Sequence, residues 1–181
     1  MVVPIGIATL GPEGTDSENA AKRIINLRNL EGGVILCDSF EIAKQKSIQD
    51  NHYFLIPAAY SSRDSNVITD TWGDFNFREM GKLELLDALV LPLKEMCVAR
   101  NDLCINPISV SLHPSTEVFA QRYANNFKRD YIHSKPLAVK RCSEGLSDLC
   151  IGSSDVIERY DNLIIQERFQ PNMVWTLYAR R

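Results

Sequence analysis

Cysteine occurs in this sequence, but in no pattern that would cross-link the chain or bind a metal. The five cysteines are an odd number and none of them belongs to a CxxC pair: Cys37, Cys97, Cys104, Cys142 and Cys150. A disulfide framework and a zinc site are therefore disfavoured. We expect reduced thiols that pack as small hydrophobic groups.

Long hydrophobic runs and basic segments are also missing. No apolar run approaches the length of a membrane span, and no basic start followed by an apolar run marks a signal peptide. The formal net charge is −3, and no stripe of lysine and arginine follows any segment, which argues against general nucleic-acid binding. We therefore expect a soluble, cytoplasmic protein with neither a membrane nor a nucleic acid as its partner.

Several well-known catalytic motifs are absent. There is no GxSxG, no HExxH and no Walker-type loop, and no metal, flavin or pyridoxal site is evident, so no cofactor is expected. What is present is a globular composition of 181 residues, 45% of them hydrophobic. This size suits one domain or two small lobes that share a cleft.

The stretch from Ile5 to Ile25 is the most informative part of the chain. A short apolar run stops at Gly11-Pro12-Glu13-Gly14, and a helical pattern follows. Thr15-x-x-Glu18 has the form of a capping box at the start of this helix. A strand, tight turn and helix in this order would present free N–H groups that suit a carboxylate or phosphate, although such a turn can also serve packing alone.

The chain predicts two successive β-α-β-α-β sets, each with a parallel sheet. The first set has strands at about 5–10, 34–37 and 53–57, and the second has strands at 108–112, 131–133 and 149–152. Residues 61–77 look like a polar loop, and 82–98 like strand material that passes between lobes. We predict an α/β protein with lobe 1 at 1–88 plus 164–181, lobe 2 at 89–163, and a ligand cleft between them.

Two further turns repeat the arrangement of polar groups between a strand and a helix. His113 follows one strand and precedes Pro114, while Ser134 and Lys135 follow another and precede Pro136. Each of these residues has an ordinary alternative: a lone histidine is usually structural, and a lysine often only solvates the surface. Parallel strands gather such turns at one edge, so a shared anionic ligand is the functional interpretation.

With these turns in order, the chain resembles the catalytic domain of prephenate dehydratase, which has a fold of the type II periplasmic-binding-protein kind. The resemblance covers essentially the whole chain and rests on LGPEGTDSENAA (10–21), IPAAY (56–60), HPSTEVFAQ (113–121), HSKPLAV (133–139), SDLCIGS (147–153) and NMVWTLY (172–178). It implies a small-molecule substrate, prephenate, and a homodimer.

The departures from the dehydratase pattern point to a different reaction. Ala59 and Tyr60 stand where dehydratases have Glu and Asn, and Val174-Trp175-Thr176 replaces a terminal Thr-Arg-Phe motif. The usual means of protonating the departing ring hydroxyl is then missing. In this the chain is similar to the prephenate decarboxylases of bacilysin- and aeruginosin-type biosynthesis, which release carbon dioxide, keep the hydroxyl and form a dihydro-4-hydroxyphenylpyruvate.

The resemblance also suggests which residues form the site. The expected catalytic residues are His113, Tyr60, Trp175 and Thr176, and the expected substrate-binding residues are Gly11, Pro12, Glu13, Gly14, Thr15, Ser17, Ser134 and Lys135. Two alternatives stay open: a divergent dehydratase that makes phenylpyruvate, and a non-catalytic protein that binds an anionic metabolite.

Overall fold

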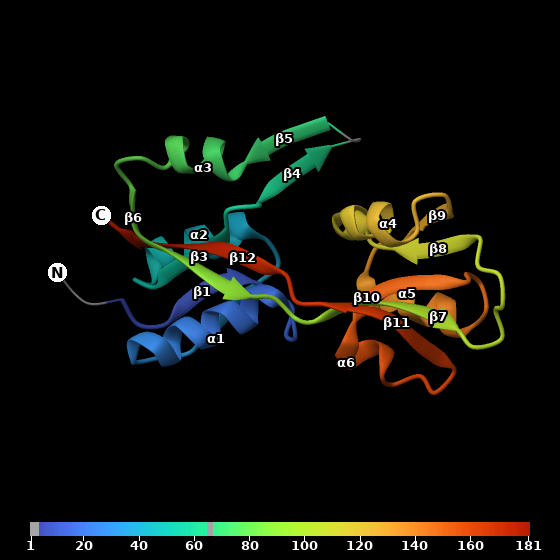
Figure 1. Ribbon diagram of the computed structural model, residues 1–181. Helices are drawn as coiled ribbons and strands as arrows, with labels where there is room; N and C mark the ends of the chain where they lie inside the picture. Colours follow the sequence, from blue (N-terminus) through green and yellow to red (C-terminus); the bar gives the residue numbers. More distant parts are fainter. Residues whose placement is uncertain (1–3, 65–66) are drawn as a thin grey trace. The chain divides into compact units, whose positions relative to one another are not determined.

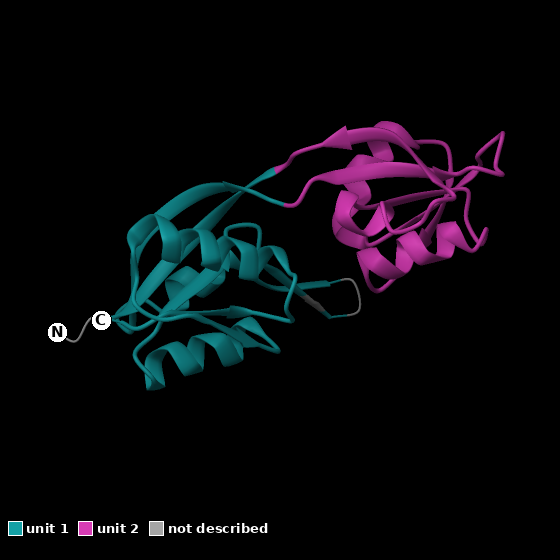
Figure 2. Ribbon diagram, turned by 90° about the horizontal axis from the view of Figure 1, so that it is seen from below, with its two compact units in different colours: residues 1–93, 172–181 teal, residues 94–171 magenta. Residues whose placement is uncertain are grey.

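The computed structural model describes residues 4–64 and 67–181. The chain divides into two compact units, residues 1–93 with 172–181 and residues 94–171, which Figure 2 shows in different colours. The boundaries inferred from sequence, 88/89 and 163/164, fall inside two strands, β6 (Leu83–Pro92) and β11 (Leu163–Phe169). The units instead divide at 93/94 and 171/172, directly after Pro92-Leu93 and Pro171, so a proline lies at each boundary.

Unit 1 is a mixed sheet with helices on both faces (Figure 1). The strand order is β2-β1-β3-β12-β6. The strands are β1 (Ile7–Leu10), β2 (Val34–Cys37), β3 (Tyr53–Pro57), β6 and β12 (Asn172–Arg180). The helix α1 (Asp16–Arg28) covers one face with Ala20, Ala21 and Ile24, and α2 (Phe40–Gln49) covers the other with Ala43.

The predicted first β-α-β-α-β set is confirmed. Strand β1 pairs in parallel with both β2 and β3, while β12 runs antiparallel to β3 and β6. The carboxyl ends of β1 and β3 therefore lie at the same edge of the sheet, beside the N-terminal part of β12. Thr9 Oγ1 links the two parallel strands by donating to the Leu55 carbonyl at 2.9 Å.

The expectation of a loop over 61–77 is wrong. Residues 65–66 lie outside the described residues. On either side of them, β4 (Ser61–Asp64) and β5 (Val67–Thr71) pair antiparallel as a hairpin, and the helix α3 (Trp72–Arg78) follows. The helix begins with a capping box, in which Thr71 and Asp74 bond to each other's backbone N–H. Polar composition concealed the hairpin, because its strands pair only with each other in a two-stranded sheet.

Unit 2 repeats the architecture with the strand order β11-β7-β10-β8-β9. Its elements are β7 (Met96–Asn101), β8 (Ser109–Leu112), a 3-10 turn (Pro114–Thr116), α4 (Glu117–Tyr123), β9 (Lys128–Tyr131), α5 (Lys135–Ser143), β10 (Leu149–Ser153), α6 (Ser154–Ile157) and β11. Strands β8, β9 and β10 are parallel, as the second predicted set requires. The strand expected at 131–133 lies earlier, at Lys128–Tyr131, because Ser134 begins α5 as its N-cap.

The two faces of the unit 2 sheet are covered unequally. Helices α5 and α6 cover one face with Val139, Cys142 and Ile157, whereas α4 packs Ala120 on the other.

All five cysteines are free thiols, and four of them are buried. No helix in the described part of the chain combines the length and apolar character needed to cross a membrane.

Candidate active site

The Gly11–Thr15 turn joins β1 to α1 at the carboxyl edge of the unit 1 sheet. Thr15 is the N-cap, and its Oγ1 accepts the Glu18 N–H at 3.3 Å. Gly14 has φ +85°, a conformation that L side chains rarely adopt, and a Cβ there would meet nothing within 4 Å. Pro12, Glu13 and Gly14 are exposed, so a ligand can reach this turn.

Glu18 modifies the expected capping box. Its Oε2 accepts the Gly14 N–H at 2.5 Å instead of the N–H of the cap residue, and its Oε1 pairs with Lys22 Nζ at 2.6 Å. Glu18 is only 4% exposed. The N–H of Gly14 is therefore not free, contrary to the prediction, and an anion at this turn would compete with a carboxylate of the chain itself. Ser17, which we expected to bind substrate, is 6% exposed in the first turn of α1.

Thr176 lies in β12 beside β3, and its hydroxyl is fully engaged. Oγ1 donates to the Ile56 carbonyl at 2.7 Å and accepts the Trp72 indole N–H at 3.0 Å. Thr176 is 1% exposed. The hydroxyl therefore ties helix α3, which carries Trp72, to the central sheet.

Tyr60 lies on the same face of the sheet as Trp72. Its ring meets Phe40 edge to face at 5.4 Å between centroids. Burial, with the negative charge of Asp70 beside it, raises the pKa of Tyr60, so the phenol stays protonated at neutral pH. Asp70 in turn accepts two bonds from Arg78, at 3.0 and 2.8 Å, which lower the pKa of its carboxyl.

Trp175 lies on the opposite face from Thr176, because neighbouring residues in a strand point in opposite directions. It is 2% exposed and packs with Ile7, Ile24 and Leu55 under α1. Its Nε1 is buried without a hydrogen-bond partner among the described residues. The structure thus brings Tyr60 and Thr176 to one face and separates Trp175 from them.

In unit 2, His113 and the Ser134-Lys135 turn follow neighbouring strands. The Ile132 N–H donates to the Leu112 carbonyl at 2.8 Å, so the two turns begin side by side. Burial, together with the positive charges of Lys135 and His133, lowers the pKa of His113. Ser134 caps α5 by accepting the Leu137 N–H at 3.3 Å. Within unit 2 the structure thus brings His113 close to Lys135, and the positive charge there suits an anion.

The hydrogen bonds around His113 indicate its tautomer. Its Nδ1 lies 3.2 Å from the Ser115 backbone N–H, which donates to it, and 2.8 Å from Ser115 Oγ. An Nδ1 that accepts from a backbone N–H carries no proton in the neutral ring, so the proton is assigned to Nε2. Nε2–H is then the donor that a ligand would meet.

Sequence reasoning missed two residues that shape this region, Asp70 and Arg78, and the bond from Trp72 to Thr176. The Thr71-x-x-Asp74 capping box was a local signal for helix α3, but the contacts of Asp70 with Tyr60 and of Trp72 with Thr176 depend on tertiary structure. Within residues 4–64 and 67–181, no three His, Cys, Asp or Glu side chains gather in a way that could hold a metal ion.

The sequence is similar to those of one group of enzymes. No family model matches the sequence. A prephenate decarboxylase from Bacillus amyloliquefaciens is 28% identical, in an alignment that covers 97% of this chain and 87% of the relative. The chain resembles prephenate decarboxylases. The similarity extends over nearly the full length of these decarboxylases, so both units take part in it.

Solved structures agree on the fold. A prephenate dehydratase from Arthrobacter aurescens in complex with L-Phe matches with a TM-score of 0.62 at 12% identity, over 98% of this chain. The chain spans 60% of the length of that dehydratase. An ABC transporter structure from Parabacteroides distasonis matches with a TM-score of 0.60 at 13% identity, over 98% of this chain and 66% of that one. The predicted prephenate dehydratase-like, periplasmic-binding-protein-like fold is thereby confirmed, and at these identities the structural matches concern the fold alone.

Proposed function

We propose that this protein is a prephenate decarboxylase that releases the ring carboxylate as carbon dioxide and leaves the ring hydroxyl in place. The observation that carries the proposal is the similarity to prephenate decarboxylases over 97% of the chain. The protein is then a cofactor-independent carboxy-lyase. Its product is a dihydro-4-hydroxyphenylpyruvate.

The reaction requires one bond cleavage and one protonation. The bond between the ring and its carboxylate breaks, and its electron pair enters the ring as carbon dioxide leaves. The displaced π electrons are captured by a proton at a ring carbon, so one proton is consumed for each carbon dioxide released. The carbon–oxygen bond of the ring hydroxyl is not broken, and the ring does not become aromatic.

The state of Thr176 favours this outcome over dehydration. Dehydration needs an acid at the departing hydroxyl. The Thr176 proton is held by the Ile56 carbonyl, and its oxygen already accepts the Trp72 N–H. Trp175 offers only a neutral indole N–H. We propose that this buried N–H, which has no partner in the described part of the chain, donates to an ordered water.

Each unit by itself contains groups that suit the pyruvyl carboxylate. In unit 1 they belong to the Gly11–Thr15 turn, where the Gly11 N–H already donates to the Cys37 carbonyl at 2.7 Å and the Gly14 N–H to Glu18, so a carboxylate would have to displace such a bond. In unit 2 they belong to Ser134 and Lys135. Charge-assisted hydrogen bonds from such groups are about twice as strong as neutral ones. The ring carboxylate is proposed to meet less polar surroundings, where its loss as a neutral molecule is favoured.

His113 is the proposed proton donor, and Tyr60 is the alternative. A dianionic substrate near His113 would raise the pKa that burial and its cationic neighbours lower in the free protein, so the imidazole would gain the proton it delivers. Tyr60 is the weaker acid, because burial and Asp70 raise the pKa of its phenol.

The test is the product formed from prephenate. We expect a non-aromatic product and no phenylpyruvate. His113→Gln should lower kcat by about 100-fold or more. His52→Gln is the matched control and should leave kcat unchanged. His52 directly precedes β3, contacts the Ile5 carbonyl, and lies at the opposite end of β3 from Tyr60. Phenylpyruvate at enzymic rates would refute the proposal, and an unaffected His113→Gln would refute the donor assignment.

Three finer predictions accompany the proposed function. The reaction is expected to serve an antibiotic or peptide pathway of secondary metabolism, in the cytoplasm, and the protein is expected to be a homodimer. Neighbouring peptide-synthesis genes would support the first, and sedimentation equilibrium measures the last directly.

A further inference from the structure

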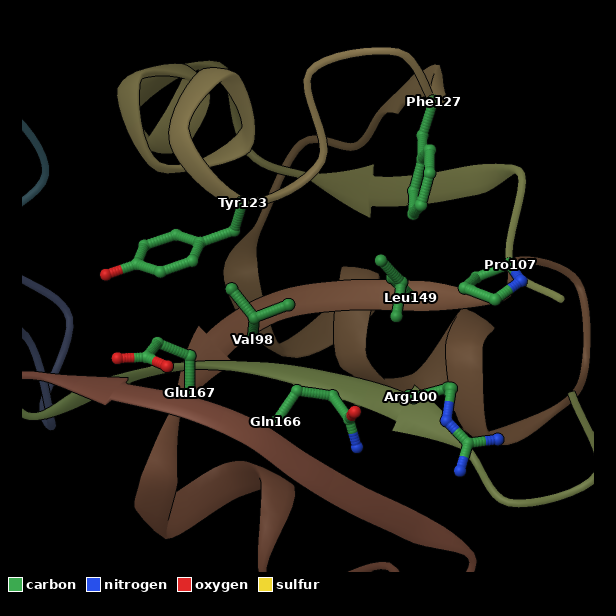
Figure 3. A pocket seen from close by; sticks show the side chains of 8 residues that line it. All are labelled: Val98, Arg100, Pro107, Tyr123, Phe127, Leu149, Gln166 and Glu167. Carbon is green, nitrogen blue, oxygen red and sulfur yellow. The ribbon is translucent and has the colours of Figure 1, made fainter. Parts of the chain in front are cut away.

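Unit 2 contains a cavity of about 230 Å³ on the face of its sheet opposite α5 and α6 (Figure 3). Its floor is formed by Val98 and Leu149, which are 3% and 4% exposed. Pro107 and Phe127 line it just before β8 and β9 begin, and Leu149 is the first residue of β10. The cavity therefore lies toward the starts of these parallel strands, whereas the proposed catalytic residues of unit 2 lie at their ends.

The Tyr123 ring forms the aromatic wall of the cavity and is held in place before any ligand arrives. The Tyr123 ring stacks on Phe169 with 5.7 Å between centroids and 8° between planes. The Arg122 guanidinium lies 5.3 Å from the centre of the same ring. A fixed ring binds an apolar ligand without the loss of side-chain entropy that ordering would require.

A β-bulge aims two consecutive side chains into the cavity. Residues next to each other in a regular strand point to opposite faces. The pairing of β11 with β7 shifts between Ile165 and Glu167, and both Gln166 and Glu167 line the cavity. Bulges commonly redirect a side chain in this way at functional sites.

The cationic and the anionic side chains of the cavity lie on opposite sides of it. Figure 3 shows the Arg100 guanidinium on one side, the Tyr123 hydroxyl and the Glu167 carboxylate on the other, and Val98 between them. Arg100 Nη1 donates to the carbonyls of Asn101 and Cys104. Both bonds use the same nitrogen, which leaves Nη2 without a bond to the described part of the chain.

We propose that this cavity binds a small carboxylic acid with an apolar ring and a hydroxyl or ammonium group at the far end. The carboxylate pairs with Arg100, the ring packs between Leu149 and the aromatic wall, and the far donor bonds to Tyr123 and Glu167. A volume of about 230 Å³ is below the common range of drug-sized pockets and holds roughly a dozen non-hydrogen atoms. The proposal is independent of the proposed decarboxylation, because no catalytic residue contributes to this cavity.

The probe is 3-(4-hydroxyphenyl)propionate, titrated into the full-length protein by calorimetry and two-dimensional NMR. We expect one site with a dissociation constant of about 0.1–10 mM. Arg100→Gln should weaken binding about tenfold or more. Arg159→Gln removes the same charge from the turn after α6, a helix that packs on the other face of the sheet, and should change nothing.

A second variant separates recognition from folding. Tyr123→Phe keeps the stacked ring and removes only the hydroxyl, so it should weaken the 4-hydroxy acid severalfold and leave 3-phenylpropionate unaffected. Prephenate turnover, measured on the same samples, should stay at the wild-type value in both cavity variants. Equal binding by Arg100→Gln and wild type, equal effects of Tyr123→Phe on both acids, or no binding at about 10 mM would each overturn the inference.

Discussion

Replacing Thr176 by valine tests how α3 is fixed to the unit 1 sheet. Valine removes the hydroxyl that donates to the Ile56 carbonyl at 2.7 Å and accepts the Trp72 indole N–H at 3.0 Å, at a site only 1% exposed. A buried polar group left without a partner costs about 1–3 kcal/mol. Because one carbonyl and one N–H lose their partner together, we expect the free energy of unfolding to fall by about 2–3 kcal/mol.

Urea unfolding followed by far-ultraviolet circular dichroism measures this loss, because the signal does not depend on Trp72 or Trp175. Thr9→Val is the matched control, because Thr9 is also fully buried but its hydroxyl makes a single bond within the described residues, to the Leu55 carbonyl, so about 1 kcal/mol is expected. In the Thr176→Val background, Trp72→Phe should cost about 1 kcal/mol less than in the wild type. Equal losses for Thr176→Val and Thr9→Val, with no coupling to Trp72, would refute this account of the hydroxyl.

Three further perturbations follow from packing and charge. Gly152→Ala would place a Cβ 2.2 Å from Val139 Cγ2 and should cost about 2 kcal/mol of overpacking, measured by urea unfolding. Lys44→Met would remove the ammonium 2.9 Å from the Glu79 carboxylate, and Glu79 is only 3% exposed. Stability at neutral pH should fall by only about 2 kcal/mol, because two other cations still lie within 4.0 Å of that carboxylate. Folding lowers the pKa of His113, so the unfolded chain binds the proton more tightly than the folded chain does. The contribution of His113 to stability is therefore complete above about pH 6.5 and is lost as the pH falls through the folded pKa. His113→Gln should flatten this part of a pH–stability curve.

The sequence predicted the parallel core of each unit because its strands are short apolar runs separated by turns and helical periodicity. Ile7 and Leu55 are fully buried in unit 1, as Val110 and Ile151 are in unit 2. For such strands, hydrophobicity and turn chemistry act in the same direction, so a local pattern is sufficient. The turns that follow them were located for the same reason.

The hairpin and α3 could not be predicted in the same way. Val67 and Ile68 are 66% and 53% exposed, so the hairpin strands have no buried face that would impose a pattern on the sequence. The position of α3 depends on long-range contacts, such as the bond from Trp72 to Thr176, 104 residues away in the sequence. Composition alone therefore favoured a loop.

The sequence alone could have predicted that Thr176 and Trp175 lie on opposite faces of the sheet. Alternation along β12 requires neighbours to point to opposite faces, but the similarity to a three-residue motif led us to group them. The hydrogen bond from the Gly14 N–H to Glu18 could not have been predicted from the sequence. A capping box and this arrangement share the same residue spacing, and only the fold of the turn decides between them.

The most direct test of the proposed function is the fate of prephenate labelled with ¹³C in its ring carboxylate, incubated with the protein in D₂O and followed by NMR. The account predicts one equivalent of labelled carbon dioxide, one deuterium bound to a ring carbon, and a ring that keeps its hydroxyl-bearing carbon and remains non-aromatic. Labelled carbon dioxide accompanied by benzenoid phenylpyruvate, or unchanged prephenate, would contradict it.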